Sequence, residues 1–177
     1  MKQRIAIIGA GLSGLTLASR LSAAAEVVVF EKARGVGGRM ATRRFEPYSF
    51  DHGAPYFTAR SAEFKKFLAP RLASGLVQEW KGKVITLAKG KKPGKRIWYE
   101  PHYVCCPAMN YLCKNLSEGI DVRTQCEVAP LLARQGNEWP IADTQGNQLG
   151  NYDLVISTAP PAQTLRLLGP HLPARAG

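Results

Sequence analysis

The sequence predicts an α/β fold built on a parallel β-sheet, and three consecutive segments carry this prediction. A β-branched run at residues 4–8 is typical of a strand that is buried on both faces of a sheet. Residues 12–21 place leucine and alanine side chains at helical spacing, and residues 26–30 end in a second apolar run. A strand, a helix and a strand within about thirty residues form a βαβ unit, so the two strands are expected to be parallel neighbours.

The middle of the chain predicts a loop, a helix and several short strands. Residues 33–48 are rich in glycine and arginine, which is typical of a long functional loop. Ser61 is a suitable N-cap for the helix that follows it. The apolar face of this helix consists of Phe64, Phe67, Leu68 and Leu72. Short strands are expected at 77–80, 84–87 and 96–99, with basic loops between them.

The last third of the chain predicts a helix, three strands and two turns. Pro107 suits the first turn of the helix, because proline lacks an N–H that this turn leaves unbonded. Gly136 and Asn137 form a turn signal between two strands. The expected elements are a helix at 107–116, strands at 121–128, 138–142 and 153–157, a turn region at 143–151, and the beginning of a further element at 165–168.

A glycine motif, G-x-G-x-x-G, lies at the turn between the first strand and the first helix. Its glycines, Gly9, Gly11 and Gly14, permit a tight turn, a close approach of backbone to a pyrophosphate, and close packing of helix on strand. The N-terminus of the helix then offers unpaired N–H groups to the phosphates. Glu31, at the end of the second strand, can accept hydrogen bonds from a ribose 2′-OH and would repel a 2′-phosphate. Together these features predict a domain of the Rossmann-like FAD/NAD(P)-binding fold class, with a bound nucleotide that has no 2′-phosphate.

The segment after Glu31 favours FAD over NAD. Gly37, Gly38 and Arg39 add a second glycine turn and a cation immediately after the second strand. A loop of this kind can cover the pyrophosphate and extend towards a flavin, whereas a simple NAD-binding fold does not need it. A basic surface loop is the alternative interpretation of the same residues.

Several segments resemble the renalase-like FAD-dependent oxidoreductases, which are relatives of the flavin amine oxidases. The segments with this resemblance read GAGLSG at 9–14, FEKARGVGGRM at 30–40, FDHGAPYFTAR at 50–60, WYEPHYVCCPAMNYL at 98–112 and DLVISTAPP at 153–161. The resemblance implies FAD as the cofactor. It also implies a substrate that gives hydride to the flavin, either an isomeric reduced nicotinamide dinucleotide or an amine, with oxygen as acceptor.

The resemblance also implies a set of cofactor-binding residues and no identifiable catalytic residue. Ser13 would meet the phosphates, Glu31 the ribose and Arg39 the pyrophosphate, while Gly53, Ala54 and Pro55 would pass close to the flavin ring. Val128 would contact adenine through its backbone. The full predicted set is Gly9, Ala10, Gly11, Leu12, Ser13, Gly14, Glu31, Lys32, Gly38, Arg39, Met40, Gly53, Ala54, Pro55 and Val128.

Two substitutions and the length depart from the family pattern. Pro55 replaces a glutamine and removes a backbone donor, and Ala108 stands where glycine is usual. Family members are about twice as long, so we expect a chain truncated before most of the substrate domain. The expected domains are an FAD-binding core with its flavin loop at 1–75, the start of a substrate-side β region at 76–106, and a continuation of the FAD-binding domain at 107–177.

Charge and cysteine usage limit the partners. The 24 Lys and Arg residues against 13 Asp and Glu residues favour an anionic partner. The basic segment 81–96, between Trp80 and Trp98, is interpreted as a solvated hairpin tip, with steering of a dinucleotide or binding of nucleic acid as alternatives. We expect a small-molecule substrate, no nucleic-acid or membrane partner and a cytoplasmic protein of undetermined oligomeric state.

The four cysteines are Cys105, Cys106, Cys113 and Cys126. None of them forms a C-x-x-C pair, so a zinc site is not expected. Small buried residues in a reducing compartment are the expected role. His52, next to Asp51, could act as a base near a flavin, but a loop histidine that caps local backbone is the favoured interpretation.

Three functional hypotheses follow from the sequence. The first is an FAD-dependent oxidoreductase. The second is a dinucleotide-binding module without turnover, and the third is an NAD-dependent dehydrogenase. Flavin turnover would exclude the second, and tight binding of NAD without flavin would exclude the first.

Overall fold

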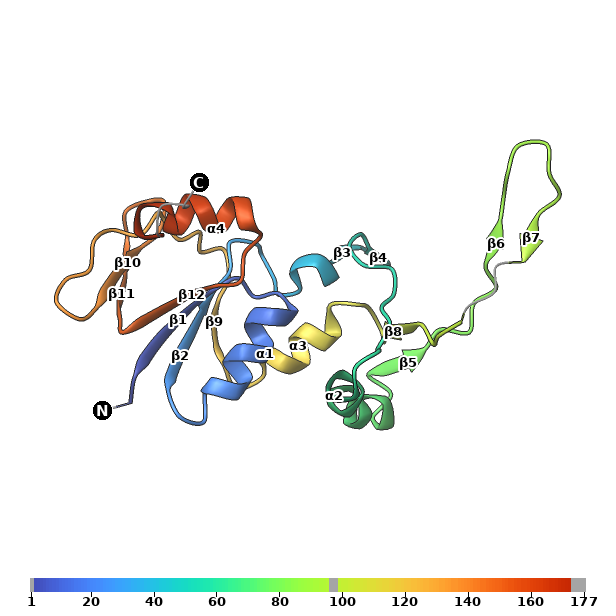
Figure 1. Cartoon of the computed structure of the whole chain (residues 1–177), viewed down its shortest axis with the longest axis horizontal. Coiled ribbons are helices and arrows are strands. Elements are labelled where there is room, and N and C mark those ends of the chain that lie inside the picture. Colours follow the sequence, from blue (N-terminus) through green and yellow to red (C-terminus); the bar gives the residue numbers. More distant parts are fainter. Residues whose placement is uncertain (1, 96–98, 173–177) are drawn as a thin grey trace.

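A computed structural model of the chain describes residues 2–95 and 99–172. A sheet of four parallel strands, in the order β12-β1-β2-β9, forms the centre of the fold (Figure 1). Helix α1 (Leu12–Leu21) connects β1 to β2, so the predicted βαβ unit is confirmed. The strands are β1 (Arg4–Ile8), β2 (Glu26–Phe30), β9 (Asp121–Arg123) and β12 (Leu154–Ser157).

Both faces of this sheet are covered. Helices α1 and α3 (Tyr111–Ser117) lie on one face (Figure 1), where Ile5, Ile7 and Val29 pack into a shared core with Leu112. The β-hairpin of β10 (Trp139–Ala142) and β11 (Gln148–Tyr152) and helix α4 (Pro161–Leu168) lie on the other face (Figure 1). There Ala6, Val28 and Phe30 pack with Tyr152 and Leu167. Side chains alternate between the two faces of a strand, so a strand that is covered on both faces needs a continuous apolar run.

Strand β12 lies within the predicted strand 153–157, and its apolar run is only partly buried. It lies at the edge of the sheet, and within the described residues it pairs only with β1, through Ile5 to Ile8. The Leu154 side chain is 40% exposed as a result. An apolar run at an edge strand is less buried because it has one neighbour instead of two.

Residues 33–48, predicted as a loop, contain regular structure that the sequence analysis missed. A 3-10 helix η1 (Gly38–Met40) is followed by an antiparallel hairpin of β3 (Thr42–Phe45) and β4 (Tyr48–Asp51). Phe45 and Tyr48 of this hairpin are 71% and 64% exposed. The hairpin has no buried face. Its strands therefore lack the alternation of polar and apolar residues from which a strand is predicted.

Helix α2 (Ala62–Ala73) confirms the predicted cap. The Ser61 Oγ atom accepts a hydrogen bond from the Phe64 N–H at 3.1 Å. Of the predicted apolar face, Leu68 is buried and Phe64 and Phe67 are half-buried. Leu72 lies on the same helical face, one turn after Leu68, but is 38% exposed near the end of the helix.

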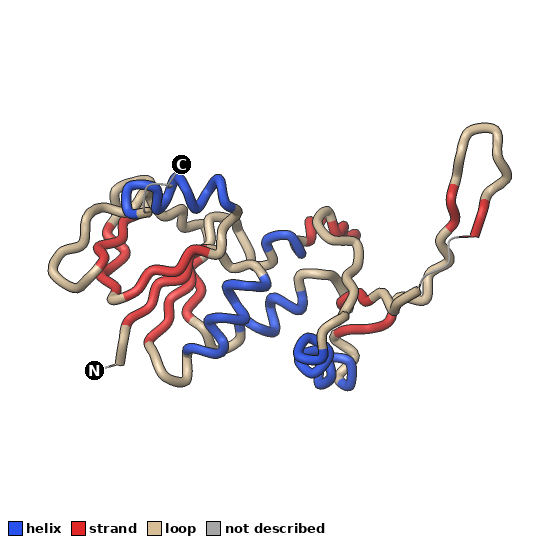
Figure 2. Tube along the Cα trace, in the orientation of Figure 1, coloured by secondary structure: helices blue, strands red, loops and turns tan. Residues whose placement is uncertain are grey.

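Two of the three expected short strands are present, and each forms an antiparallel pair with a strand that the sequence did not predict. Strand β5 (Val77–Glu79) pairs with β8 (Tyr103–Cys105), and β6 (Ile85–Thr86) pairs with β7 (Gly94–Lys95). The predicted strand at 96–99 falls mainly on residues outside the described part of the chain. Figure 2 shows that loops dominate this region, in contrast to the strands and helices around the main sheet.

Helix α3 begins at Tyr111, so the predicted start at Pro107 was wrong. The Met109 N–H donates to Asp51 Oδ1 at 3.1 Å, and the Asn110 N–H donates to Thr42 Oγ1 at 3.3 Å. These donors bind the segment to the β3–β4 hairpin. The chain before Tyr111 therefore follows the hairpin and not a helical path.

Two further boundaries after α3 were wrong. Strand β9 ends at Arg123, because Gln125 adopts a left-handed conformation with φ of 55° and turns the chain. The predicted turn region 143–151 contains all of β11 except its last residue, Tyr152. The turn itself is confined to the residues that follow Asp143. The Asp143 carboxylate forms this turn by accepting hydrogen bonds from the N–H groups of Gln145 and Asn147, each at 2.9 Å. The Gly136 turn between Gln135 and Glu138 is confirmed.

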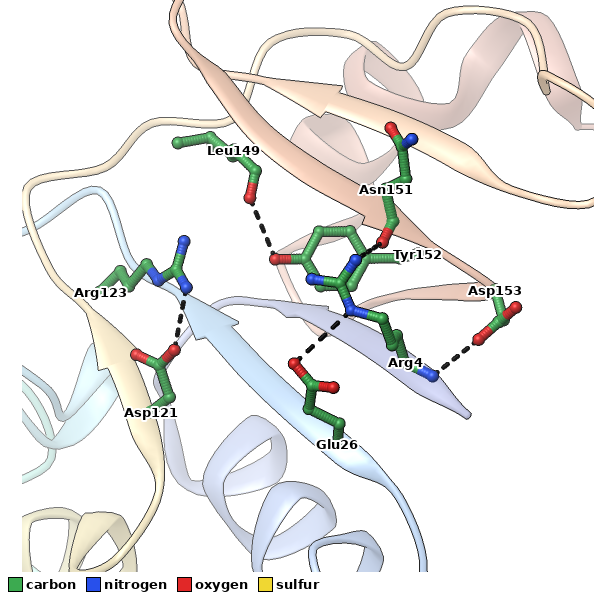
Figure 3. A network of polar contacts seen from close by, with 8 residues as sticks. All are labelled: Arg4, Glu26, Asp121, Arg123, Leu149, Asn151, Tyr152 and Asp153. Atoms are coloured by element: carbon green, nitrogen blue, oxygen red, sulfur yellow. Dashed lines mark hydrogen bonds and ion pairs between the residues drawn. The ribbon is translucent and has the colours of Figure 1, made fainter. Parts of the chain in front are cut away.

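A polar network joins the amino ends of the parallel strands (Figure 3). The Arg4 N–H donates to Asp153 Oδ2 at 2.7 Å, and the Arg4 guanidinium donates to the Asn151 carbonyl at 2.8 Å and lies over the Tyr152 ring. Arg4 Nε also lies 3.5 Å from Glu26 Oε1. These contacts connect β1, β2 and the β11–β12 turn at the end of the sheet opposite to the cavity described next.

Candidate functional site

A cavity of about 640 Å³ opens at the carboxyl ends of β1, β2 and β12. Strand β2, which follows β1 in the sequence, pairs on one side of β1. Strand β12, which comes much later in the sequence, pairs on the other side. This change of direction is a topological switch point, where open α/β sheets bind their ligands. The volume lies within the range of sites for small molecules and cofactors.

The first wall of the cavity is the turn between β1 and α1. Gly9 has a φ of 107°, which favours glycine, and a β-carbon on Gly14 would lie 2.0 Å from the Gly9 carbonyl oxygen. Gly11 is the N-cap of α1 and has no side chain to satisfy the first N–H groups of the helix. These N–H groups and the helix dipole are therefore available to a phosphate, as the motif predicts.

The second glycine turn packs directly against the first. The Gly37 N–H donates to the Ala10 carbonyl at 3.0 Å, and Gly11 and Gly37 form an isolated parallel bridge. A β-carbon on Gly38 would lie 3.2 Å from the Gly11 Cα. This contact places Gly38, Arg39 and Met40 in the cavity lining beside the helix N-terminus.

Glu31 follows β2 and lines the cavity. Its Oε2 atom accepts a hydrogen bond from the Ala10 N–H and its Oε1 atom accepts one from the Ala33 N–H, both at 2.8 Å. The carboxylate is thus oriented by the two loops that it joins. Each carboxylate oxygen can accept a further hydrogen bond, so a ribose hydroxyl can still be bound.

The far wall of the cavity comes from the last third of the chain. Val128 lines the cavity and lies in an isolated antiparallel bridge with Asp143. Thr158, directly after β12, holds the first turn: its N–H donates to the Ile8 carbonyl at 2.9 Å, and its hydroxyl lies 3.2 Å from the Gly9 carbonyl. The lining residues that sequence reasoning missed include Cys126, Glu127, Pro130, Thr144, Thr158, Ala159, Pro160, Gln163, Arg166 and Leu167.

Two signals could have found part of this wall. Thr158 follows a parallel strand, and the carboxyl ends of parallel strands meet at one edge of the sheet. Gln163 and Arg166 are three residues apart in a segment where the sequence predicts only an element at 165–168 of unspecified type, and as parts of α4 they lie on the same face of the helix. Glu127 and Thr144 have no such signal, because only long-range packing brings them to the cavity.

Five of the predicted cofactor residues do not line the cavity. Ala10 is buried and Gly14 lies behind the first turn. Gly53, Ala54 and Pro55 are also outside the lining: the Ala54 N–H donates to the Arg39 carbonyl of η1 at 2.8 Å, a β-carbon on Gly53 would meet the same carbonyl, and Pro55 is exposed. The other predicted residues line it: Gly9, Gly11, Leu12, Ser13, Glu31, Lys32, Gly38, Arg39, Met40 and Val128.

The residues beside the predicted flavin segment have structural contacts. Asp51 Oδ1 accepts hydrogen bonds from Thr42 Oγ1 at 2.5 Å and from the Met109 N–H, while His52 is exposed. Pro55 is exposed and Ala108 is buried. Asp51 therefore serves to hold the β3–β4 hairpin against the start of α3.

The charged groups in the cavity lining are mixed in sign. Lys32, Arg39 and Arg166 are the cations, and Glu31 and Glu127 are the anions. The cations and the free N–H groups of α1 lie in the same lining as the two glycine turns. The site therefore suits a ligand with a pyrophosphate and a neutral polar part that can donate to a carboxylate.

The cysteines are all free, and Cys105 and Cys113 are buried. Burial raises the pKa of the Cys126 thiol, which lines the cavity, and the negative charge of Asp143 adds to this effect. Within residues 2–95 and 99–172, no group of three His, Cys, Asp or Glu side chains is placed to hold a metal ion. No helix in the same ranges combines the length and the apolar character needed to cross a membrane.

Comparison with known proteins identifies the first part of the chain. Residues 7–70 match the NAD(P)-binding Rossmann-like domain family. A stretch of 51 residues is 45% identical to a 4,4′-diapophytoene desaturase (4,4′-diaponeurosporene-forming) of Staphylococcus aureus strain Newman. This stretch covers 28% of the chain and 10% of the desaturase.

Solved structures extend the likeness to nearly the whole chain. A mutant of putrescine oxidase superposes with a TM-score of 0.74 at 13% sequence identity, over 99% of this chain and 62% of that one. An oxidoreductase from Methanosarcina mazei superposes with a TM-score of 0.67 at 18% identity, over 96% of this chain and 62% of that one. The fold is therefore a Rossmann-like α/β fold shared with oxidoreductases, and the chain spans less than two thirds of the length of these relatives.

Proposed function

We propose that this chain binds FAD and forms the cofactor-binding part of an FAD-dependent oxidoreductase. The observation that carries the proposal is the contact between the two glycine turns at the N-terminus of α1. It places Arg39 beside the free N–H groups of α1 and leads from there to Glu31 in one continuous cavity. The desaturase, the oxidase and the oxidoreductase that resemble the chain support the same class of activity.

The residues present fit a flavin dinucleotide. The two glycine turns lie so close together that a β-carbon on Gly38 would press against Gly11. Glycine backbone therefore lines the cavity at this point. The N–H groups of α1 and Arg39 would hold the pyrophosphate, Glu31 would accept from the adenosine ribose, and the segment at Val128 would lie beside the adenine. When bound, FAD would supply the redox chemistry by accepting hydride from a reduced substrate, with oxygen as the final acceptor.

The visible absorption spectrum of the purified chain, with the released cofactor identified after denaturation, tests this proposal first. Flavin bands and released FAD are expected, or uptake of added FAD by the colourless protein. Arg39→Ala is expected to weaken FAD binding about tenfold, since one charge-assisted contact to a phosphate is removed. Arg43→Ala, on the exposed strand β3, is the matched control and should bind FAD normally.

Other results would contradict the proposal. Tight binding of NAD without any uptake of FAD would assign the chain to the NAD-dependent dehydrogenases. Binding of neither dinucleotide would leave no role for the cavity as a dinucleotide site. Bound FAD that no reduced substrate can bleach would favour a dinucleotide-binding module without turnover.

The substrate proposal is finer and depends on bound FAD. We propose a renalase-like activity on an isomeric reduced nicotinamide dinucleotide, with an amine as the second choice, because the segments at 9–14, 30–40 and 50–60 resemble those of the renalase-like oxidoreductases. Bleaching of the flavin bands under anaerobic conditions by one of these compounds, and recovery in air, is the expected result. A flavoprotein that none of them bleaches would contradict the substrate class and leave the cofactor proposal intact.

A further inference from the structure

A basic arm, residues 81–95, projects away from the rest of the molecule (Figure 1). Strands β6 and β7 form its only regular structure, with Ile85 paired to Lys95 and Thr86 to Gly94. Residues 85–95 are all exposed. A two-stranded hairpin with no face packed against other elements has little stability of its own. The arm is therefore suited to contact something outside the described part of the chain.

The charge of the arm has one sign only. No acidic residue occurs between Glu79 and Glu100. Within the described residues, no ion pair joins a lysine of the arm to a carboxylate. The lysines of the arm are Lys81, Lys83, Lys89, Lys91, Lys92 and Lys95.

Apolar side chains lie next to these lysines. Ile85 is 56% exposed and Leu87 is 73% exposed. Near the base of the arm, Tyr99 is 95% exposed. Exposed apolar side chains beside a lysine cluster match a surface that offers both negative charge and a hydrocarbon layer.

We propose that the basic arm binds the surface of a membrane that contains anionic lipids. Its lysines would contact the lipid phosphates while Ile85 and Leu87 enter the interface. This proposal revises the expectation of no membrane partner. It is independent of the proposed redox function.

Nucleic acid is the less suitable partner for the described arm. The basic segment 81–96 contains six lysines and a single arginine, Arg96, although arginine is the side chain that best binds phosphates and bases in a bidentate manner. The same residues contain no aromatic side chain on which a base could stack. Exposed Ile85 and Leu87 would gain nothing from a phosphate backbone.

Flotation of the full chain with lipid vesicles tests the proposal. We expect binding to vesicles of phosphatidylcholine mixed with phosphatidylglycerol, and at least about tenfold weaker binding to phosphatidylcholine alone. Added salt should weaken the binding, because it screens the attraction. Equal binding to both kinds of vesicle, or none to either, would overturn the proposal.

Two sets of variants separate the arm from net charge. Lys89→Glu combined with Lys91→Glu and Lys92→Glu should abolish binding to the mixed vesicles. Lys2→Glu with Lys65→Glu and Lys66→Glu makes the same change in net charge at exposed positions outside the arm and should keep the binding. Equal loss in both triple variants would reduce the effect to net charge and overturn the proposal.

The apolar part of the arm has its own test. Ile85→Ser with Leu87→Ser is expected to weaken binding to mixed vesicles about tenfold with the lysines intact. Unchanged binding would contradict insertion of these side chains. Tighter binding of the unmodified chain to duplex DNA at the same salt concentration, lost in the arm triple variant, would assign the arm to nucleic acid. Circular dichroism melting curves confirm that each variant is folded.

Discussion

At the scale of single residues, the first glycine turn leaves the least room for change. The Gly14 Cα faces the Gly9 carbonyl, and the Thr158 hydroxyl closes the remaining space. The turn therefore depends on a contact between the first and the last strand of the sheet.

Gly14→Ala is expected to destabilise the fold by about 1–3 kcal/mol and to abolish dinucleotide binding. The added β-carbon would lie 2.0 Å from the Gly9 oxygen and 2.9 Å from Thr158 Oγ1, so the turn must shift. Urea unfolding and titration with FAD measure the two effects. Gly35→Ala, which meets nothing within 4 Å, is the control, and a Gly14 variant as stable as that control would contradict the packing argument.

Glu31→Gln is expected to weaken FAD binding and to lower stability by about 1–2 kcal/mol. One of the two amide positions would present an NH₂ group to a backbone N–H of Ala10 or Ala33, where the carboxylate accepts at 2.8 Å. Glu26→Gln removes a carboxylate that forms an exposed ion pair with Arg4, and such pairs contribute little. Comparable urea midpoints for the two variants would show that Glu31 does not orient the turn.

At the scale of elements, helix α4 contributes both to the core and to the cavity wall. Leu167 packs with Ala6, Val28 and Ile141 on the face of the sheet that the β10–β11 hairpin covers. Gln163 and Arg166 of the same helix line the cavity. The Leu167 carbonyl accepts from the Leu131 N–H at 3.0 Å, which ties the helix to the neighbouring segment. The packing of α4 therefore positions one wall of the site.

Leu167→Ala is expected to cost about 2–5 kcal/mol of stability, because it leaves a cavity in a buried cluster. Leu165→Ala on the same helix removes a side chain that is 61% exposed and should change stability by at most about 0.5 kcal/mol. Thermal unfolding of the pair gives the comparison. Similar melting temperatures would mean that α4 is not packed as described.

Local sequence patterns predict some elements of this fold and not others. The βαβ unit and the cap at Ser61 follow from nearest neighbours along the chain, and both are confirmed. The β3–β4 hairpin lacks a buried face, and the start of α3 depends on contacts with Asp51 and Thr42 far away in sequence. Periodicity contains no information on such contacts.

The candidate site likewise contains residues that local sequence patterns predict and residues that they do not. Gly9, Gly11 and Glu31 lie within one βαβ unit, so their spacing predicts where they meet. Arg166 and Glu127 come to the cavity through the packing of later elements onto the other face of the sheet. Their positions depend on the whole topology and could not be read from spacing.

At the scale of the whole molecule, two buried thiols make stability depend on alkaline pH. Burial raises the pKa of Cys105 to about 11 and that of Cys113 to about 12, from an ordinary value of 9.0. Below pH 9 the thiols keep their protons in both the folded and the unfolded chain, and their contribution to stability is complete. As the pH rises from about 9 towards the two raised values, only the unfolded chain loses protons, so stability falls.

We expect each thiol to account for a loss on the order of 2 kcal/mol by about pH 11. Cys113→Ala should make the decline of stability above pH 9 shallower, whatever its effect at neutral pH. Cys106→Ala keeps both buried thiols and should leave the slope unchanged. Urea unfolding at a series of pH values measures these slopes, and identical slopes in the two variants would contradict the role of Cys113.

The pairing of β1 with β12 also determines when the molecule can assemble. Arg4 and Asp153 lie 149 residues apart in the sequence and are bonded at the start of this pair. During synthesis Thr158 leaves the ribosome 149 residues after Gly9. Closing so long a loop is slow, so the cavity is completed only after β12 has paired with β1. A dinucleotide that needs the complete cavity can therefore be bound only after Thr158 has left the ribosome.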